Sequence, residues 1–297
     1  MNFFKKLYCR VYQAVFRVLL PFLPYRKPKL LRSNEELAKV IKDAGIERVI
    51  LVTDKGVRGL GLTSSLEKIL KDANIKVVVF DDVVPNPTTD NVNSALIEYL
   101  ENDCQAIIAI GGGSPIDCAK ALGALVAKPK KSLSQMKGVL KVRAKLPILI
   151  AVPTTAGTGS ETTLATVITD SETRHKYAIN DFPLIPKYAL LDAKLTVGLP
   201  KHITSTTGID ALTHAIEAYI GRSTTSETRK YALSSIKKIF ENIKTAYIDG
   251  GNLEARQAML EAAFEAGVAF TKSYVGYVHA IAHSLGGKYD VAVITEA

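Results

Sequence analysis

The fold follows from Ile107-Ile-Ala-Ile-Gly111-Gly-Gly-Ser114-Pro-Ile-Asp117-Cys-Ala-Lys120, in which an apolar run ends in three glycines and gives way to helical spacing. The apolar run predicts a buried strand, and the residues after Pro115 predict a helix. We expect Ser114 to cap this helix and Pro115 to occupy its first position. Three glycines allow positive φ and close approach of a ligand, and a helix N-terminus attracts anions. The stretch is therefore either an ordinary βα turn or a phosphate-binding turn.

The composition is that of a globular protein with one large or two modest domains. The chain has 297 residues, of which 47% are hydrophobic and 23% charged. Its net charge is +9, but the basic residues are scattered rather than gathered with aromatic ones, so we expect no nucleic-acid partner. Cys9, Cys104 and Cys118 lie far apart without metal-binding spacing, which predicts reduced thiols in a cytoplasmic protein.

Residues 1–24 have one apolar face at helical spacing, and Lys5, Lys6, Arg10 and Arg17 interrupt the apolar runs of the sequence. No apolar run is long enough to cross a bilayer, and none is followed by the cleavage site of a signal peptide. We expect a helix docked on the body of the protein or on a partner subunit. The alternative is a helix on a membrane surface. We take residues 1–30 as this amphipathic extension.

Strand and helix patterns alternate through the next part of the chain. Strands are expected at 49–53, 77–80, 106–110, 146–153 and 188–192, helices at 63–73 and 90–101, and a β-hairpin at 164–169 and 175–179. This order predicts a parallel sheet with helices on both faces. Asp54 follows the first strand, where a carboxylate either accepts from a ribose hydroxyl or serves a turn. Because G-x-G-x-x-G is absent, a dinucleotide would bind by a different layout.

The strand at 146–153 runs into Thr154-Thr-Ala-Gly157-Thr-Gly-Ser160-Glu161, a loop dense in hydroxyls and accessible backbone amides. Such a loop suits phosphate and ribose contacts. Lys176, in the predicted hairpin, either reaches the cofactor or substrate or is an exposed strand lysine.

After Pro200 the strand signals stop and helical periodicity takes over, so we place a first domain at 31–200 and an all-α domain at 201–297. Asp210 and His214 are four residues apart on one helix face, and His279 and His283 repeat this spacing further along. A carboxylate and imidazoles from separate helices suit iron(II) or zinc. A hydrogen-bonded surface pair is the alternative for Asp210 and His214.

Four motifs, at 111–120, 153–161, 208–219 and 278–283, occur in order. Together they resemble the iron-containing (group III) alcohol dehydrogenase family, over residues 48–287. The resemblance implies an α/β Rossmann-like NAD-binding domain, an all-α metal-binding domain as in the dehydroquinate synthase-like fold, and a cleft between them. It also implies hydride transfer between a small primary alcohol or aldehyde and NAD(H), with Fe2+ or Zn2+ in the cleft, by a homo-oligomer when full length.

The resemblance also implies residue roles. The pyrophosphate would bind at Gly111, Gly112, Gly113, Ser114 and Asp117. The rest of the nucleotide would contact Thr154, Thr155, Thr158, Ser160 and Lys176, with Asp54 at the position associated with NAD preference. The metal ligands would be Asp210, His214 and His279, and His283 would be a catalytic residue beside the nicotinamide.

The sequence departs from the family near its end. The family's fourth metal ligand is a histidine fourteen residues beyond the position of His279, which is Val293 here, and residues 289–297 no longer resemble the family. We therefore expect a truncated or frameshifted chain with an incomplete helical domain, weak metal binding and little activity. A non-catalytic nucleotide-binding remnant is the alternative. A dehydroquinate-synthase-like lyase is disfavoured by the Asp210-x-x-x-His214 pattern and the loop at 157–161.

Overall fold

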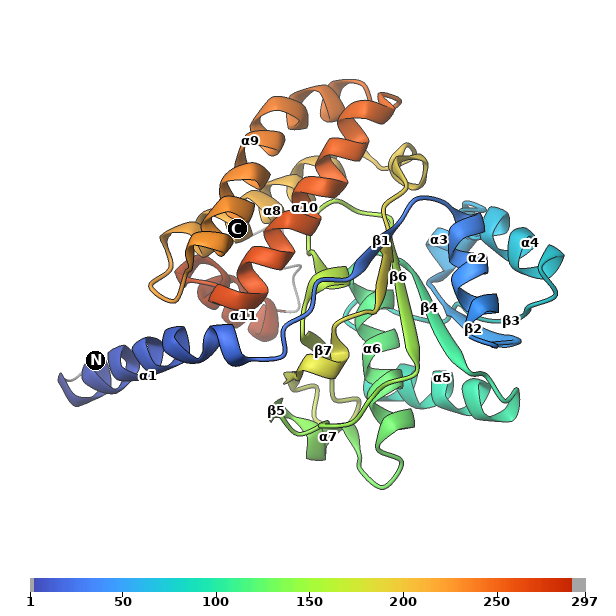
Figure 1. The fold of residues 1–297 in the computed structure, drawn as a ribbon, viewed down its shortest axis with the longest axis horizontal. Helices are drawn as coiled ribbons and strands as arrows, with labels where there is room; N and C mark the ends of the chain where they lie inside the picture. Colours follow the sequence, from blue (N-terminus) through green and yellow to red (C-terminus); the bar gives the residue numbers. More distant parts are fainter. Residues whose placement is uncertain (1–2, 290–297) are drawn as a thin grey trace.

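The computed structural model describes residues 3–289, and shows an α/β part joined to a helical part (Figure 1). Six strands form one sheet in which all neighbours are parallel, in the order β1-β9-β6-β4-β2-β3. Their bounds are Lys29–Leu31 for β1, Arg48–Val52 for β2, Lys76–Phe80 for β3, Ala106–Gly111 for β4, Ile148–Pro153 for β6 and Tyr188–Leu190 for β9. The predicted parallel sheet is confirmed. The expected boundary at residue 30 falls inside its edge strand β1.

Helices cover both faces of this sheet, as predicted. The helices α2 (Asn34–Asp43) and α4 (Ser64–Asp72) pack on the face to which Val49 and Leu51 point. The helices α5 (Thr89–Glu101) and α6 (Gly113–Ala127) pack on the opposite face, with Ile50 and Val52. Alternate residues of β2 thus enter different cores, which explains its continuous apolar run. The short helices α3 (Lys55–Gly59) and α7 (Leu133–Met136) lie in connections.

A smaller sheet lies beside the parallel one, in the order β5-β8-β7. The strands β7 (Ala165–Thr169) and β8 (Lys176–Asn180) form the predicted antiparallel hairpin, and β5 (Gly138–Val139) joins β8 in parallel. Single 3-10 turns occur at Leu20–Phe22, Ser160–Thr162, Phe182–Leu184 and Ala193–Thr196. In the large sheet β4 lies between β2 and β6. The chain order reverses between β2 and β4, and ligands of open α/β sheets bind at the carboxyl ends of strands beside such a reversal.

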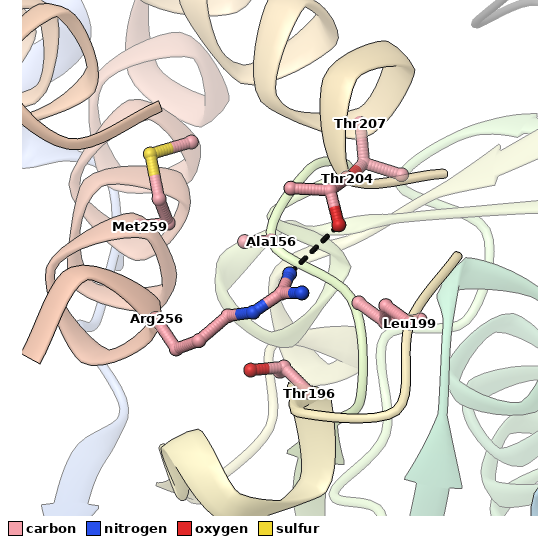
Figure 2. Close-up of a pocket in the computed structure, with 7 residues that line it drawn as sticks. All are labelled: Ala156, Thr196, Leu199, Thr204, Thr207, Arg256 and Met259. Atoms are coloured by element: carbon pink, nitrogen blue, oxygen red, sulfur yellow. Dashed lines mark hydrogen bonds between the residues drawn. The ribbon is translucent and has the colours of Figure 1, made fainter. Parts of the chain in front are cut away.

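The helical part contains α8 (Lys201–Ile220), α9 (Ser226–Ile248), α10 (Leu253–Ser273) and α11 (Tyr277–Tyr289). Small side chains such as Ala211 and Ala263 allow close packing in its core. The buried Arg256 of α10 ties these helices together, because its guanidinium donates to Thr204 Oγ1 at 2.7 Å and to the Gly250 carbonyl at 3.0 Å. Figure 2 shows this guanidinium beside a cavity of about 10 Å³, room for about one water molecule. Arg256 thus fixes the first turns of α8.

The helix α1 (Phe3–Leu19) extends away from the body (Figure 1). Its large apolar side chains are exposed, among them Phe4, Val11 and Val18. The apolar face therefore does not dock on the body, and its docking on a partner subunit stays a prediction. The helix does contact the body through Tyr12, which hydrogen-bonds Tyr274. The pKa of Tyr274 is raised, first by burial and second by this hydrogen bond. Within residues 3–289, no helix combines the length and apolar character that crossing a membrane requires.

Candidate functional site

The glycine turn after β4 differs in detail from the expectation. Helix α6 begins at Gly113 with Gly112 as its N-cap, so Ser114 does not cap it and Pro115 is not its first residue. The Ser114 hydroxyl instead accepts from the Asn86 N–H at 3.3 Å. Only Gly111 of the three has positive φ, at +151°, and a Cβ there would lie 2.5 Å from Pro115 Cγ. Glycine is thus required at Gly111 for conformation, and the early helix start directs the N–H groups of α6 beyond the sheet edge.

The loop after β6 lies against this turn. The Thr154 N–H donates to the Gly111 carbonyl at 3.0 Å, and a Cβ on Gly112 would lie 3.4 Å from Thr155 Oγ1. The two glycines of the loop serve packing: a Cβ on Gly157 would lie 2.7 Å from Thr207 Cβ, and one on Gly159 would lie 2.9 Å from Gly267 Cα. These close contacts join the loop to α8 and α10, so both parts of the protein border one site.

A buried lysine that the sequence analysis did not select holds the turn and the loop together. Lys120 is fully buried, and its Nζ donates to Ser160 Oγ at 3.2 Å, Thr163 Oγ1 at 2.7 Å and the Ala165 carbonyl at 2.8 Å. Burial lowers the pKa of Lys120 to about 8, although Asp117 and Glu161 act in the opposite direction. Burial also raises the pKa of Glu161 to about 7. The i, i+3 spacing of Asp117 and Lys120 is the sequence signal for this network.

Asp117 accepts hydrogen bonds with both carboxylate oxygens. The Ser160 hydroxyl donates to Oδ1 at 2.8 Å, and the Val167 N–H donates to Oδ2 at 3.0 Å. Burial raises the pKa of Asp117, and Lys120 and these hydrogen bonds oppose the shift. The carboxylate therefore links α6 to the loop and to β7.

Helices α8 and α11 bring Asp210, His214 and His279 together. One potential ligand atom from each lies within 4.8 Å of the others, and all three side chains are buried. His279 Nε2 lies 3.4 Å from Asp210 Oδ1, and His214 Nδ1 lies 3.7 Å from Asp210 Oδ2. The His214 ring stacks between Phe270 and His279, with both centroid distances 4.1 Å. A buried carboxylate and two imidazoles at this separation fit a divalent iron or zinc ion.

Glu217, three residues after His214, holds the third of these residues in place. Its Oε2 lies 2.7 Å from His279 Nδ1, and the carboxylate also accepts from the N–H groups of Gly276 at 2.6 Å and Val278 at 2.7 Å. Burial alone would raise the pKa of Glu217, but these hydrogen bonds lower it overall. A carboxylate at Nδ1 favours a proton on that nitrogen, which would leave the Nε2 lone pair available to a metal ion. The sequence analysis quoted Glu217 without selecting it, although Asp210, His214 and Glu217 recur at i, i+4 and i+7.

A cavity of about 670 Å³ joins the glycine turn to the Asp210–His214–His279 group. Its volume lies within the range of small-molecule sites. Lys176 lines it and donates to Asn86 Oδ1 at 2.7 Å. The predicted site residues that line it are Gly113, Ser114, Asp117, Thr158, Ser160, Lys176, Asp210, His214 and His279. The predicted residues that do not line it are Asp54, Gly111, Gly112, Thr154 and Thr155.

Three predicted positions need separate description. Asp54 caps α3, where its carboxylate accepts from the Val57 N–H at 2.9 Å, and it follows β2 at the same sheet edge as the glycine turn. His283 is on α11, one turn beyond His279, but its side chain lies outside the described part of the chain. Val293, at the position of the expected fourth ligand, also lies outside the described residues, so the expectation of weak metal binding stays a prediction.

Comparison with known proteins places the chain in a family. The family model for iron-containing alcohol dehydrogenase matches residues 31–193, and that for the C-terminal part of the Fe-containing alcohol dehydrogenase family matches residues 204–292. The 1,3-propanediol dehydrogenase of Klebsiella pneumoniae is 38% identical over 279 residues, which are 93% of this chain and 71% of that protein. The chain belongs to the iron-containing alcohol dehydrogenase family.

Solved structures agree with this assignment. A crystal structure of 1,3-propanediol oxidoreductase has a TM-score of 0.88 and 37% identity, over 92% of this chain and 71% of that one. Sulfoacetaldehyde reductase from Bifidobacterium kashiwanohense in complex with NAD+ has a TM-score of 0.82 and 29% identity, over 91% and 72% of the two chains. The protein is an oxidoreductase whose cofactors are NAD and iron, and the predicted fold class, a Rossmann-like domain followed by helices, is confirmed.

Proposed function

We propose that this chain transfers hydride between small primary alcohols or aldehydes and NAD(H) in the cavity that joins the glycine turn to the Asp210–His214–His279 group. The continuity of that cavity carries the proposal, because a nucleotide held at one end reaches the buried carboxylate and imidazoles at the other. Residues 31–200 act as the NAD-binding domain and residues 201–297 as the metal-binding domain.

The cofactor end binds phosphate through backbone groups. Gly111, Gly112 and Gly113 bring the first N–H groups of α6 to the pyrophosphate, where the positive end of the helix dipole favours negative charge. Three further side chains line the cavity beside the pyrophosphate site: the hydroxyls of Ser114 and Thr158 and the ammonium group of Lys176. Thr154 and Thr155 position this wall, while Asp117 and Ser160 both line it and Ser160 donates to Asp117.

The reacting end is built from α8 and α11. Asp210, His214 and His279 hold the metal, with Glu217 keeping the Nδ1 proton on His279. Iron(II) held by these residues would act as a Lewis acid that lowers the pKa of the substrate hydroxyl and so favours hydride transfer to the nicotinamide. Phe270 packs on His214 and walls the cavity, which keeps water from the reacting carbon. His283, one turn beyond His279, is the candidate for contact with the nicotinamide.

We further propose that the protein, when full length, is a homo-oligomer in the cytoplasm. Helices α8 and α9 expose apolar side chains, including Ile220, Phe240 and Ile248, that suit a contact between copies. Cys104 and Cys118 are buried thiols rather than a disulfide, which suits a reducing compartment. Sedimentation velocity of the purified chain, with Phe240→Ser as the variant expected to shift it toward monomer, tests the oligomer.

The activity is tested by measuring NADH binding, metal binding and turnover separately. The iron-loaded chain should form NADH from a primary alcohol and NAD only slowly, because Val293 stands where the family has its fourth metal ligand, and Asp210→Ala should abolish this turnover while NADH binding persists. Turnover that survives Asp210→Ala would contradict the metal site. NADH binding without turnover, in a chain that binds iron, would support the non-catalytic remnant instead.

A further inference from the structure

Helix α1 has two chemically different sides. By helical spacing, Phe4, Leu7, Val11, Val15 and Val18 share one side, and the aromatic rings of Phe3 and Tyr8 extend it. Lys6 and Arg10, one turn apart, lie on the other side. The apolar side is not covered by the body: Phe4 is 77% exposed and Val18 is 69% exposed. An apolar face of this size on a soluble protein marks a surface that another partner covers.

The charge around this face is of one sign. The first 34 residues contain eight basic residues and no acidic one, the first acidic residue being Glu35. The basic residues are Lys5, Lys6, Arg10, Arg17, Arg26, Lys27, Lys29 and Arg32. Of these, Arg26 and Lys27 bond to neutral groups of the body, the carbonyls of Pro183 and Ile185 and the Tyr231 hydroxyl. The segment therefore brings positive charge, with no acidic residue of its own, to the apolar face.

From these observations we infer that α1 binds the surface of a membrane rich in anionic lipids, with its apolar side among the acyl chains and its basic side among the headgroups. An amphipathic helix with aromatic residues on one side and lysine or arginine on the other lies in the plane of a lipid interface. A second copy of α1 is a poorer partner, because the helix offers no acidic side chain to pair with Lys6 or Arg10. The segment between α1 and β1 contains Pro21, Pro24 and Pro28 and joins the helix to the body as a semi-rigid spacer.

Co-sedimentation of the full chain with lipid vesicles tests the inference. Binding to phosphatidylcholine vesicles containing phosphatidylglycerol should be strong, should weaken as salt rises, and should be much weaker with phosphatidylcholine alone. Each basic side chain near an anionic surface contributes about five-fold, so Lys6→Gln with Arg10→Gln should lower partitioning about thirty-fold. The matched control, Lys39→Gln with Lys68→Gln on the exposed sides of α2 and α4, removes the same charge and should change nothing.

A second measurement reports insertion of the apolar side. The chain contains no tryptophan, so Tyr8→Trp places a single tryptophan on α1, and its emission should shift to shorter wavelength with anionic vesicles. Adding Phe4→Ser and Val11→Ser should abolish that shift.

Three results would overturn the inference: no binding to anionic vesicles, an equal loss in the α2/α4 control, or an oligomer in solution that Phe4→Ser with Val11→Ser dissociates while vesicles fail to bind. The last would make the face a subunit contact.

Discussion

Replacing Glu217 with alanine should destabilise the helical part and weaken its metal site together. The substitution leaves three donors without their acceptor: the N–H groups of Gly276 and Val278 and Nδ1 of His279. A buried donor that loses its acceptor costs about 1–3 kcal/mol. Because Gly276 and Val278 are partly exposed, water can replace part of their loss, so we expect about 3 kcal/mol in total. Loss of a carboxylate behind a metal-binding histidine should lower metal affinity about 10–100-fold.

Urea unfolding followed by circular dichroism gives the first quantity, and titration with Zn2+ gives the second. Glu217→Gln keeps an oxygen acceptor, so it should retain most of the stability and still lose metal affinity. Glu241→Ala, which removes an exposed carboxylate paired with Lys237, is the control and should cost about 0.5 kcal/mol or less. Unchanged unfolding and unchanged Zn2+ affinity in a folded Glu217→Ala protein would refute the role assigned to this carboxylate.

Other substitutions examine the turn, the buried network, cofactor choice and the thiols. Gly111→Ala should lower the free energy of unfolding by about 1–3 kcal/mol and weaken NADH binding, because Gly111 has positive φ and a Cβ there would meet Pro115. Gly112→Ala should fold normally, and equal urea midpoints for the two variants would contradict this prediction. Lys120→Met should cost about 3–5 kcal/mol in urea unfolding, because Asp117 and Glu161 lose their buried cation, and a neutral result would count against the network. The protein should bind NAD more tightly than NADP by about 1 kcal/mol or more, because the Asp54 carboxylate would repel the 2′-phosphate of NADP. In fluorescence titrations Asp54→Gly should reduce this difference in binding free energy, and equal affinities in the unsubstituted protein would exclude the role of Asp54. Ellman's reagent should label Cys9 quickly, but Cys104, whose pKa burial raises to about 11, and Cys118 only after unfolding; rapid labelling of all three would contradict their burial.

The regular elements could be predicted from the sequence because their signals are periodic. The strand expected at 77–80 is β3, Lys76–Phe80, and the helix expected at 63–73 is α4, Ser64–Asp72. The start of α6 could not be predicted from local preference, which favours serine at the cap. Ser114 bonds instead to Asn86, a residue 28 positions away, and this pairing depends on how the strands are arranged in space.

The metal-binding residues of the site could be predicted from the sequence, but the residues that hold the site in place, Glu217 and Lys120, could not. Aspartate and histidine at helical spacing indicate the group on α8 and α11. The partner of Glu217 lies on another helix, 62 residues further along, and Lys120 meets its acceptors 40 to 45 residues away. A lysine and a glutamate within helical patterns are ordinarily surface residues, so only the packed structure reveals that these two are buried.

The contact between Gly159 and Gly267 limits how the two parts of the protein can move. The space there is filled by the Gly159 backbone and the short side chain of Thr162, since a Cβ on Gly267 would overlap Thr162 Oγ1 and lie 2.9 Å from the Gly159 carbonyl oxygen. Substrate and cofactor must nonetheless enter a cavity whose lining residues come from both parts. We therefore expect this glycine pair to act as a pivot, with the helices rocking about it and the cavity, which Tyr274 and Val275 also line, widening as they do.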